Sequence, residues 1–325
     1  MWSRFYSIAQ NTFVETVRQP IFGVILVLTA ILLILNVALA ANTLDDDDKL
    51  LLDLGLNTLL LSGLFLSAFS AAGILNREIE NKTVLSVVSK PVSRPLFILG
   101  KFAGLQMALA LAFFISTMVF ILAQRHGVLA NSSDPWDGPV LAFGFGSVFF
   151  SVLAAAFCNY FYSKHFSTTA IFLTAPLLAA TVIIVGFLDE GWKPIAFGSN
   201  YVGGQVLIAA FLVFLVVQLT ATVALAASTR TGQVMTLLIC TGFLLVGIVS
   251  DYAFGQHADS SFLAALAYGI LPNIGPFWVI DGLYAESFET TVPFYYVGYV
   301  LAYTALITTA ILALAIAAFQ RREVG

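Results

Sequence analysis

Residues 20–41 read PIFGVILVLTAILLILNVALAA and contain no charged side chain. Because roughly 20 apolar residues in a helix cross the hydrocarbon core of a bilayer, this stretch predicts a membrane-spanning helix. Seven further stretches share its apolar character: residues 50–75, 96–123, 140–162, 166–188, 201–227, 234–250 and 292–319. We therefore expect an all-α, polytopic transmembrane helix bundle with about eight spans, or six if the hairpin at 140–188 does not cross.

The composition of the whole chain agrees with a membrane protein. Of its 325 residues, 60% are hydrophobic and only 10% are charged, whereas a soluble protein carries about 25% charged residues. The long apolar runs lack the alternation of β-barrel strands. The net charge of −4 argues against a nucleic-acid binder. Cys158 and Cys240 lie inside apolar runs and predict neither a disulfide framework nor a metal site.

The distribution of basic residues predicts the orientation. With eight spans, eleven of the fourteen Lys and Arg residues fall on the same side as the N-terminus. Lys and Arg accumulate in the cytoplasmic segments of membrane proteins. We therefore expect both termini in the cytoplasm.

Two segments outside the spans have their own character. In residues 1–19, Trp2, Tyr6 and Phe13 recur at helical spacing opposite polar residues, which predicts an amphipathic helix at the membrane interface. Residues 20–325 then form the transmembrane domain. Within it, residues 251–291 are too apolar for a solvated loop, and prolines interrupt them, so we expect a re-entrant or interfacial outer region.

The connection between the second and third predicted spans is the most informative segment for function. Residues 73–104 read GILNREIENKTVLSVVSKPVSRPLFILGKFAG and contain five of the fourteen basic residues. Ile79, Val84, Leu85 and Val88 could form the apolar side of a short cytosolic helix that ends before Pro91, because a residue that precedes proline resists the helical conformation. From the pattern alone, this segment is either a docking helix for a partner or a positive loop that only sets the topology.

This segment resembles the cytosolic loop of the ABC-2 class of ABC transporter permeases, in its NosY-like branch, which includes the permease of nitrous-oxide-reductase maturation. The family pattern runs E-x-E, then a Thr, a short apolar helix, S-K/R-P-V-S-R and G-K. The residues that fit it are Glu78, Glu80, Thr83, Ser89, Lys90, Pro91, Val92, Ser93, Arg94, Gly100 and Lys101. Weaker similarities lie at residues 226–236 and 271–281. Such permeases usually have six spans, so residues 140–188 look like an inserted hairpin.

The resemblance implies a permease subunit of an ATP-driven ABC exporter in the bacterial cytoplasmic (inner) membrane. It implies a homodimer in contact with membrane lipids and two separate ABC ATPase subunits that bind ATP and Mg. No cofactor-binding, catalytic or metal site is expected in this chain, because it lacks the phosphate-binding loop GxxxxGK[ST]. Residues 1–19 would be the family's elbow helix, and residues 76–95 its coupling loop. The residues expected to contact the ATPase are Glu78, Ile79, Glu80, Thr83, Val84, Leu85, Val88, Pro91 and Arg94.

Polar residues inside the spans are candidates for a substrate pathway, because they are costly in lipid. Asn57, Gln106, Asn159 and Gln218 could line such a pathway or make hydrogen bonds between helices. Two other functions stay open. A secondary transporter would need an inverted repeat or paired intramembrane charges, and an integral-membrane enzyme would need a catalytic constellation at a membrane face. The sequence presents neither pattern.

Overall fold

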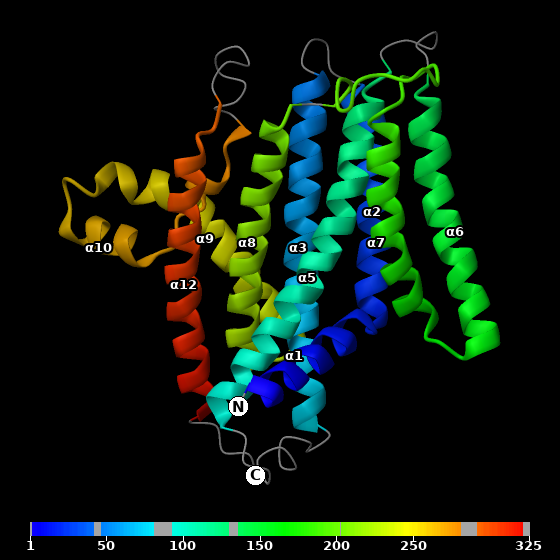
Figure 1. Ribbon diagram of the computed structural model, residues 1–325. Helices are drawn as coiled ribbons and strands as arrows, with labels where there is room; N and C mark the ends of the chain where they lie inside the picture. The colour runs from blue at the N-terminus through cyan, green and yellow to red at the C-terminus, as the bar shows by residue number, and fades with distance from the viewer. Residues whose placement is uncertain are drawn as a thin grey trace. The chain divides into compact units, whose positions relative to one another are not determined.

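The computed structural model describes residues 2–41, 47–80, 93–129, 136–201, 203–280 and 291–320, with only the backbone of 75–80 and 270. These residues contain eight helices long and apolar enough to cross a membrane, as in an integral membrane protein. The all-α, eight-helix prediction is therefore confirmed (Figure 1). The helices are α2 (Pro20–Ala40), α3 (Asp47–Glu80), α5 (Arg94–His126), α6 (Gly138–Tyr162), α7 (Phe166–Val185), α8 (Gln205–Ser228), α9 (Gln233–Ala253) and α12 (Phe294–Gln320).

Local sequence sets several helix ends. Pro20 is the first residue of α2, and Pro95 lies in the first turn of α5, where the missing proline N–H costs no helical hydrogen bond. Asp137 caps α6, and its carboxylate accepts a 2.9 Å hydrogen bond from the Val140 N–H. Ser163 ends α6 in the left-handed conformation (φ 52°), so α7 begins after only three residues.

The described chain divides into two compact units, and several helices contribute to both. One unit comprises Met1–Thr16, Gly63–Leu109 and Phe211–Gly325. The other comprises Val17–Ser62 and Ala110–Ala210. We call them the first and second units.

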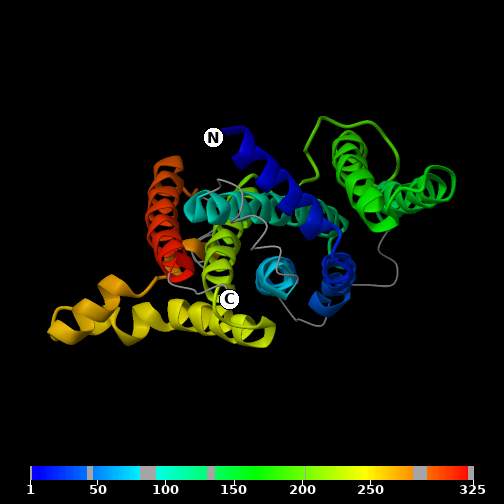
Figure 2. The same ribbon diagram turned by 90° about the horizontal axis from the view of Figure 1, so that it is seen from below.

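In the first unit, α1 (Trp2–Val17) packs directly on the start of α5, as Figure 2 shows. A Cβ at Gly100 would lie 2.6 Å from Cγ2 of Ile8, and a Cβ at Gly104 would lie 2.6 Å from Cβ of Thr12. Both distances are shorter than van der Waals contact. The two glycines of this GxxxG pair thus allow the backbones to approach closely, as such motifs do in membrane helices.

Only part of the predicted apolar face of α1 packs against the protein. Ala9 and Val17 are buried, as are Thr12 and Thr16, whereas Trp2 and Tyr6 are 84% and 66% exposed. Burial of Thr16 is tolerated because its hydroxyl donates a 2.7 Å hydrogen bond to the Thr12 carbonyl one turn earlier. The helix itself is confirmed, and its exposed aromatic side chains suit a membrane interface.

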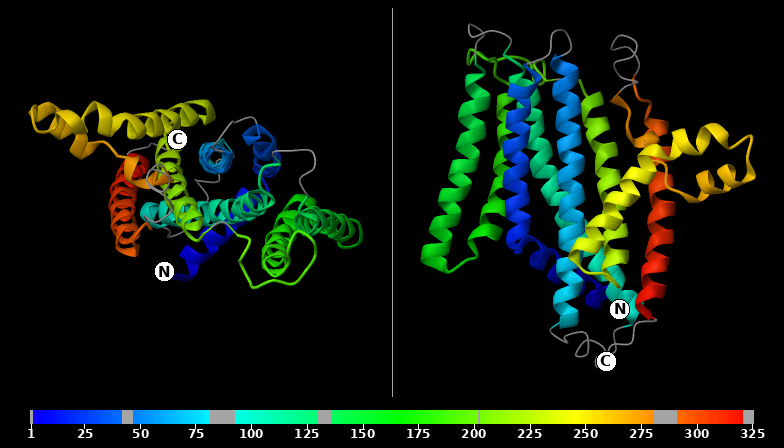
Figure 3. Two further views of the ribbon diagram at one scale, coloured as in Figure 1. Left: turned by 90° about the horizontal axis from the view of Figure 1, so that it is seen from above. Right: turned by 180° about the vertical axis from the view of Figure 1, so that it is seen from behind.

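The region between α9 and α12 contains short helices, as expected from its prolines. They are η1 (Gly255–His257), α10 (Phe262–Ile270) and η2 (Gly275–Phe277), and α10 extends away from α12 (Figure 3). Asn273 connects them. Its side-chain amide donates to the Tyr268 hydroxyl at 3.1 Å, and its backbone N–H donates to the Tyr303 hydroxyl at 2.8 Å. The Tyr268 hydroxyl donates to Asp251 at 2.9 Å, and this hydrogen bond raises the pKa of Tyr268 above 10.0.

In the second unit, α6 and α7 form an antiparallel hairpin, and α7 also contacts α2. The Thr181 hydroxyl of α7 donates to the Phe143 carbonyl of α6 at 3.2 Å. Asn36 of α2 donates to the Thr58 hydroxyl of α3 at 3.0 Å. Polar side chains of α2 and α3 therefore make interhelical hydrogen bonds, one of the two roles expected for such residues.

Candidate functional site

The predicted coupling segment is only partly described. Thr83, Val84, Leu85, Val88 and Pro91 lie outside the described residues. The backbone of Glu78, Ile79 and Glu80 is helical and forms the last turn of α3. The structure thus places Ile79 at the end of a spanning helix rather than in a separate short helix. With 34 residues, α3 is about 50 Å long, which exceeds the hydrocarbon thickness of about 30 Å.

Arg94, the first residue of α5, binds the end of α12. Its Nη1 atom donates to the Gln320 carbonyl at 2.7 Å and to the Phe319 carbonyl at 3.4 Å. The Phe97 and Phe319 rings stack beside this contact, 5.8 Å apart. The last carbonyls of a helix have no intrahelical partner and carry partial negative charge. The Arg94 guanidinium donates hydrogen bonds to these carbonyls and offsets their partial negative charge.

A second arginine reaches the same helix end. Nη2 of Arg230, in the turn between α8 and α9, donates to the Ala318 carbonyl at 3.1 Å. The start of α5, the α8–α9 turn and the end of α12 therefore meet at one end of the first unit.

Sequence reasoning missed an ion pair between α1 and α5. The Lys101 ammonium lies 3.6 Å from a Glu15 carboxylate oxygen, with side-chain exposures of 2% and 27%. The ammonium also lies 5.6 Å from the centre of the Phe97 ring. Burial of an unpaired ammonium would be unfavourable. The Glu15 carboxylate of α1 therefore compensates the charge of the buried Lys101 ammonium. The signal in the sequence was a lysine between the two glycines that contact α1.

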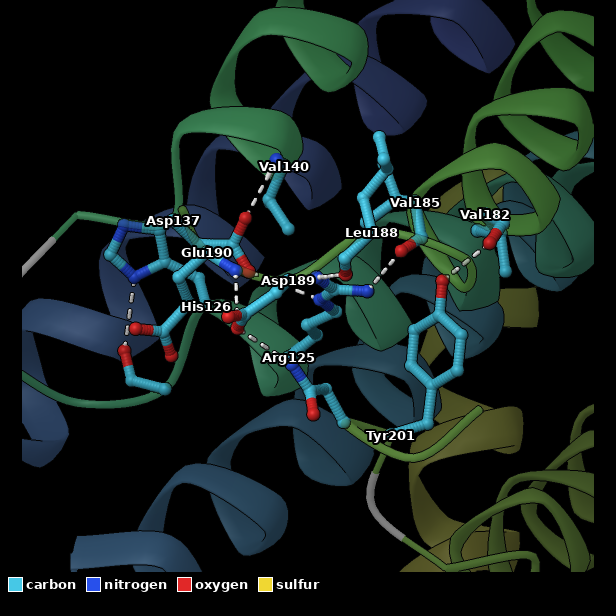
Figure 4. A network of polar contacts seen from close by, with 12 residues as sticks. Arg125, His126, Asp137, Val140, Val182, Val185, Leu188, Asp189, Glu190 and Tyr201 are labelled. Atoms are coloured by element: carbon cyan, nitrogen blue, oxygen red, sulfur yellow. Dashed lines mark hydrogen bonds and ion pairs between the residues drawn. The ribbon is translucent and has the colours of Figure 1, made fainter. Parts of the chain in front are cut away.

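The second unit contains another ion pair that sequence reasoning missed, shown in Figure 4. Nε of Arg125 donates to Oδ2 of Asp137 at 3.0 Å, and both side chains are 1% exposed. The two terminal nitrogens of the guanidinium donate to the carbonyls of Val185 and of Leu188, the latter at 2.6 Å. One side chain thus joins the end of α5, the start of α6 and the end of α7.

Tyr201 completes this cluster. The Arg125 guanidinium lies 5.5 Å from the centre of its ring, and its hydroxyl donates to the Val182 carbonyl of α7. Burial raises the pKa of the Tyr201 phenol above 10.0, although the nearby Arg125 acts in the opposite direction. The described polar contacts of the cluster are all internal to the second unit, so we assign it a structural role.

Two of the four predicted pathway residues make local contacts. Asn57 is exposed, and its amide donates to the Asp53 carbonyl of its own helix at 2.9 Å. Asn159 is also exposed, and its amide donates to the Lys164 carbonyl at 2.6 Å, which closes the turn between α6 and α7. The local role of Asn159 could have been read from its position four residues before Ser163.

The structure brings the other two pathway residues together. Nε2 of Gln106 on α5 donates to the Gln218 carbonyl on α8 at 3.0 Å and lies 3.3 Å from the Thr222 hydroxyl. Oε1 of Gln106 and Nε2 of Gln218 are buried and have no hydrogen-bond partner among the described residues. One acceptor and one donor are therefore left unpaired in an apolar bundle.

These polar groups provide hydrogen bonding rather than reactive chemistry. Within the described ranges, no group of three or more His, Cys, Asp or Glu side chains could hold a metal ion. The chain matches no protein-family model and no curated protein.

Proposed function

We propose that the protein is the membrane-spanning permease subunit of an ATP-driven ABC exporter. The observation that carries this proposal is the gathering of three contacts at one end of the first unit. They are α1 on the start of α5, and Arg94 and Arg230 on the end of α12. A coupling loop at residues 76–95 would need rigid attachment to the spans at this end.

In the proposed mechanism, two copies of the chain form the substrate pathway, and separate ATPase subunits drive it. ATP-dependent closure of the ATPases displaces the segment that precedes Arg94. Because Arg94 bonds to the last carbonyls of α12, the displacement reaches α12 as well as α3 and α5. The spans then move as rigid bodies and switch the pathway from one side of the membrane to the other. The bacterial inner membrane and cytoplasmic termini are part of the same proposal.

The ion pairs Lys101–Glu15 and Arg125–Asp137 give little support to the alternative of a secondary transporter. Such a carrier would place titratable groups near the middle of its spans. Arg125 is the penultimate residue of α5, Asp137 caps α6, and Glu15 lies in α1 outside the eight apolar helices. Lys101 is paired and lies only seven residues from the start of α5.

The test is purification of the full chain from its native membranes in mild detergent, followed by photolabelling with 8-azido-ATP and Mg²⁺. We expect a co-purifying subunit to be labelled and the permease itself to remain unlabelled. A Val84→Asp, Leu85→Asp variant should lose the labelled subunit, because each apolar contact contributes roughly 1.5–3 kcal/mol when buried. The matched control is Ser132→Asp, Ser133→Asp in the opposite connection, and it should retain the subunit. Labelling of the permease alone, or an unchanged complex in the first variant, would contradict the proposal.

A further inference from the structure

Gln106 and Gln218 lie deep within their helices. Gln106 follows the first residue of α5 by twelve residues, and Gln218 precedes the last residue of α8 by ten. At a rise of 1.5 Å per residue, these separations are about 18 Å and 15 Å. Both ends belong to the same face of the bundle, so the two amides lie near the middle of a hydrocarbon core about 30 Å thick.

The unpaired atoms are unfavourable at this depth. The Oε1 atom of Gln106 is an acceptor and the Nε2 atom of Gln218 is a donor, and both are buried without a partner among the described residues. A polar group in lipid has no water to replace a missing hydrogen bond. The amide orientation of Gln106 is set by its donation to the Gln218 carbonyl, so its oxygen must face elsewhere. A role in helix association alone would not require either unpaired atom.

Among the described residues, the hydrogen-bond partners of Gln106 are uncharged: the Gln218 carbonyl and the Thr222 hydroxyl. Lys101 precedes Gln106 by five residues, which places it about 140° around the helix and on another face, where Glu15 pairs with it. The polar groups nearby are hydroxyls: Thr222 on α8 accepts a hydrogen bond from Gln106, and Ser67 on α3 donates to the carbonyl of Val217, the residue before Gln218, at 3.5 Å. The described contacts of the amides therefore offer a charged ligand no counter-charge.

We propose that Gln106 and Gln218 form the polar contact of a binding site for an uncharged amphiphile with a hydroxyl or amide head. Such a group donates to Oε1 of Gln106 and accepts from Nε2 of Gln218, and its apolar body lies against the bundle. Both glutamines are half-buried, and the adjacent Met107 is 45% exposed. The inference rests on the proposed export function, for which it names the substrate class.

The test uses the full chain in lipid nanodiscs without any ATPase. The probe is a long-chain alcohol with a photoactivatable diazirine beside its hydroxyl. The comparison probes are the hydrocarbon and the carboxylate of the same length. We expect the alcohol to label α5 and α8 near the two glutamines. Loss of one hydrogen bond should reduce labelling roughly 2- to 10-fold in Gln106→Leu and in Gln218→Leu. Diacylglycerol should compete with the probe, and water-soluble glycerol should not.

Thr222→Val is the matched control, because it removes a neighbouring hydroxyl but keeps both unpaired amide atoms. It should retain the labelling. Equal labelling by the hydrocarbon, stronger labelling by the carboxylate, competition by glycerol, or unchanged labelling in the Leu variants would overturn the inference. An equal loss in Thr222→Val would also overturn it, because helix packing would then explain the result. Since no ATPase takes part, failure here is separate from failure of the 8-azido-ATP experiment.

Discussion

Replacement of Arg125 by Met would remove the guanidinium that joins α5, α6 and α7 but keep a side chain of similar length. It would leave the Asp137 carboxylate, which is 1% exposed, without its cationic partner. The carbonyls of Val185 and Leu188 would each lose a charged donor. We expect the end of the α6–α7 hairpin to loosen first, because this side chain bonds to both of its helices.

The magnitude follows from the burial of the pair. Removal of one member of a buried ion pair destabilises a protein by about 3–5 kcal/mol, mainly because the remaining charge is uncompensated. Arg125→Met together with Asp137→Asn removes that charge and keeps an oxygen that can cap Val140. Both variants lose the two hydrogen bonds from the guanidinium, so they differ in the uncompensated Asp137 charge. The double variant should therefore be more stable than the single variant by about 2 kcal/mol.

The assay is reversible unfolding in mixed detergent micelles, combined with hydrogen–deuterium exchange of the amides of residues 138–141 and 185–188. The matched control is Lys193→Met, which removes an exposed basic residue from the same unit. It should change the free energy of unfolding by less than about 1 kcal/mol. A comparable small change in Arg125→Met, or a double variant less stable than the single one, would refute the structural role of this pair.

Three further results are expected. Gly104→Val should weaken the packing of α1 on α5 by about 1–3 kcal/mol because the close approach leaves no room for a side chain, whereas Gly23→Val, with open space around its Cβ position, should not. Thermal unfolding of the two variants, measured side by side, checks this. Reporter fusions should score cytoplasmic after Lys164 and external after Lys193, and the same side for both would mean that the α6–α7 hairpin does not cross. In the folded protein, the pKa of the Tyr268 phenol should lie above its usual value of about 10. The stabilisation that the protonated phenol provides is therefore complete below about pH 10 and is lost as the pH rises through this higher pKa. Absorbance titration of wild type minus Tyr268→Phe measures this midpoint, which Asp251→Asn should lower, because it removes the main cause of the shift.

Composition along the chain was sufficient to predict the spanning helices. Each apolar run is long enough to cross a bilayer by itself, and a helix satisfies its own backbone hydrogen bonds. Local residues also predicted where helices begin, as Pro20 shows at α2. The positions of helices depend mainly on neighbours within a few residues, so one sequence contains this information.

Which polar side chains meet was decided only by the tertiary structure. Gln106 and Gln218 are 112 residues apart, and nothing in their local sequence distinguishes them from Asn57, which bonds locally. From the sequence, Arg125 was expected only to be one of the three basic residues on the side opposite the N-terminus. Its partners come from three helix ends that meet through packing. A hydrogen bond between helices depends on how close and at what rotation two helices pack, and that is set by all the residues of both faces together. Apolar composition thus determined the helices, while packing determined which of their few polar groups form sites.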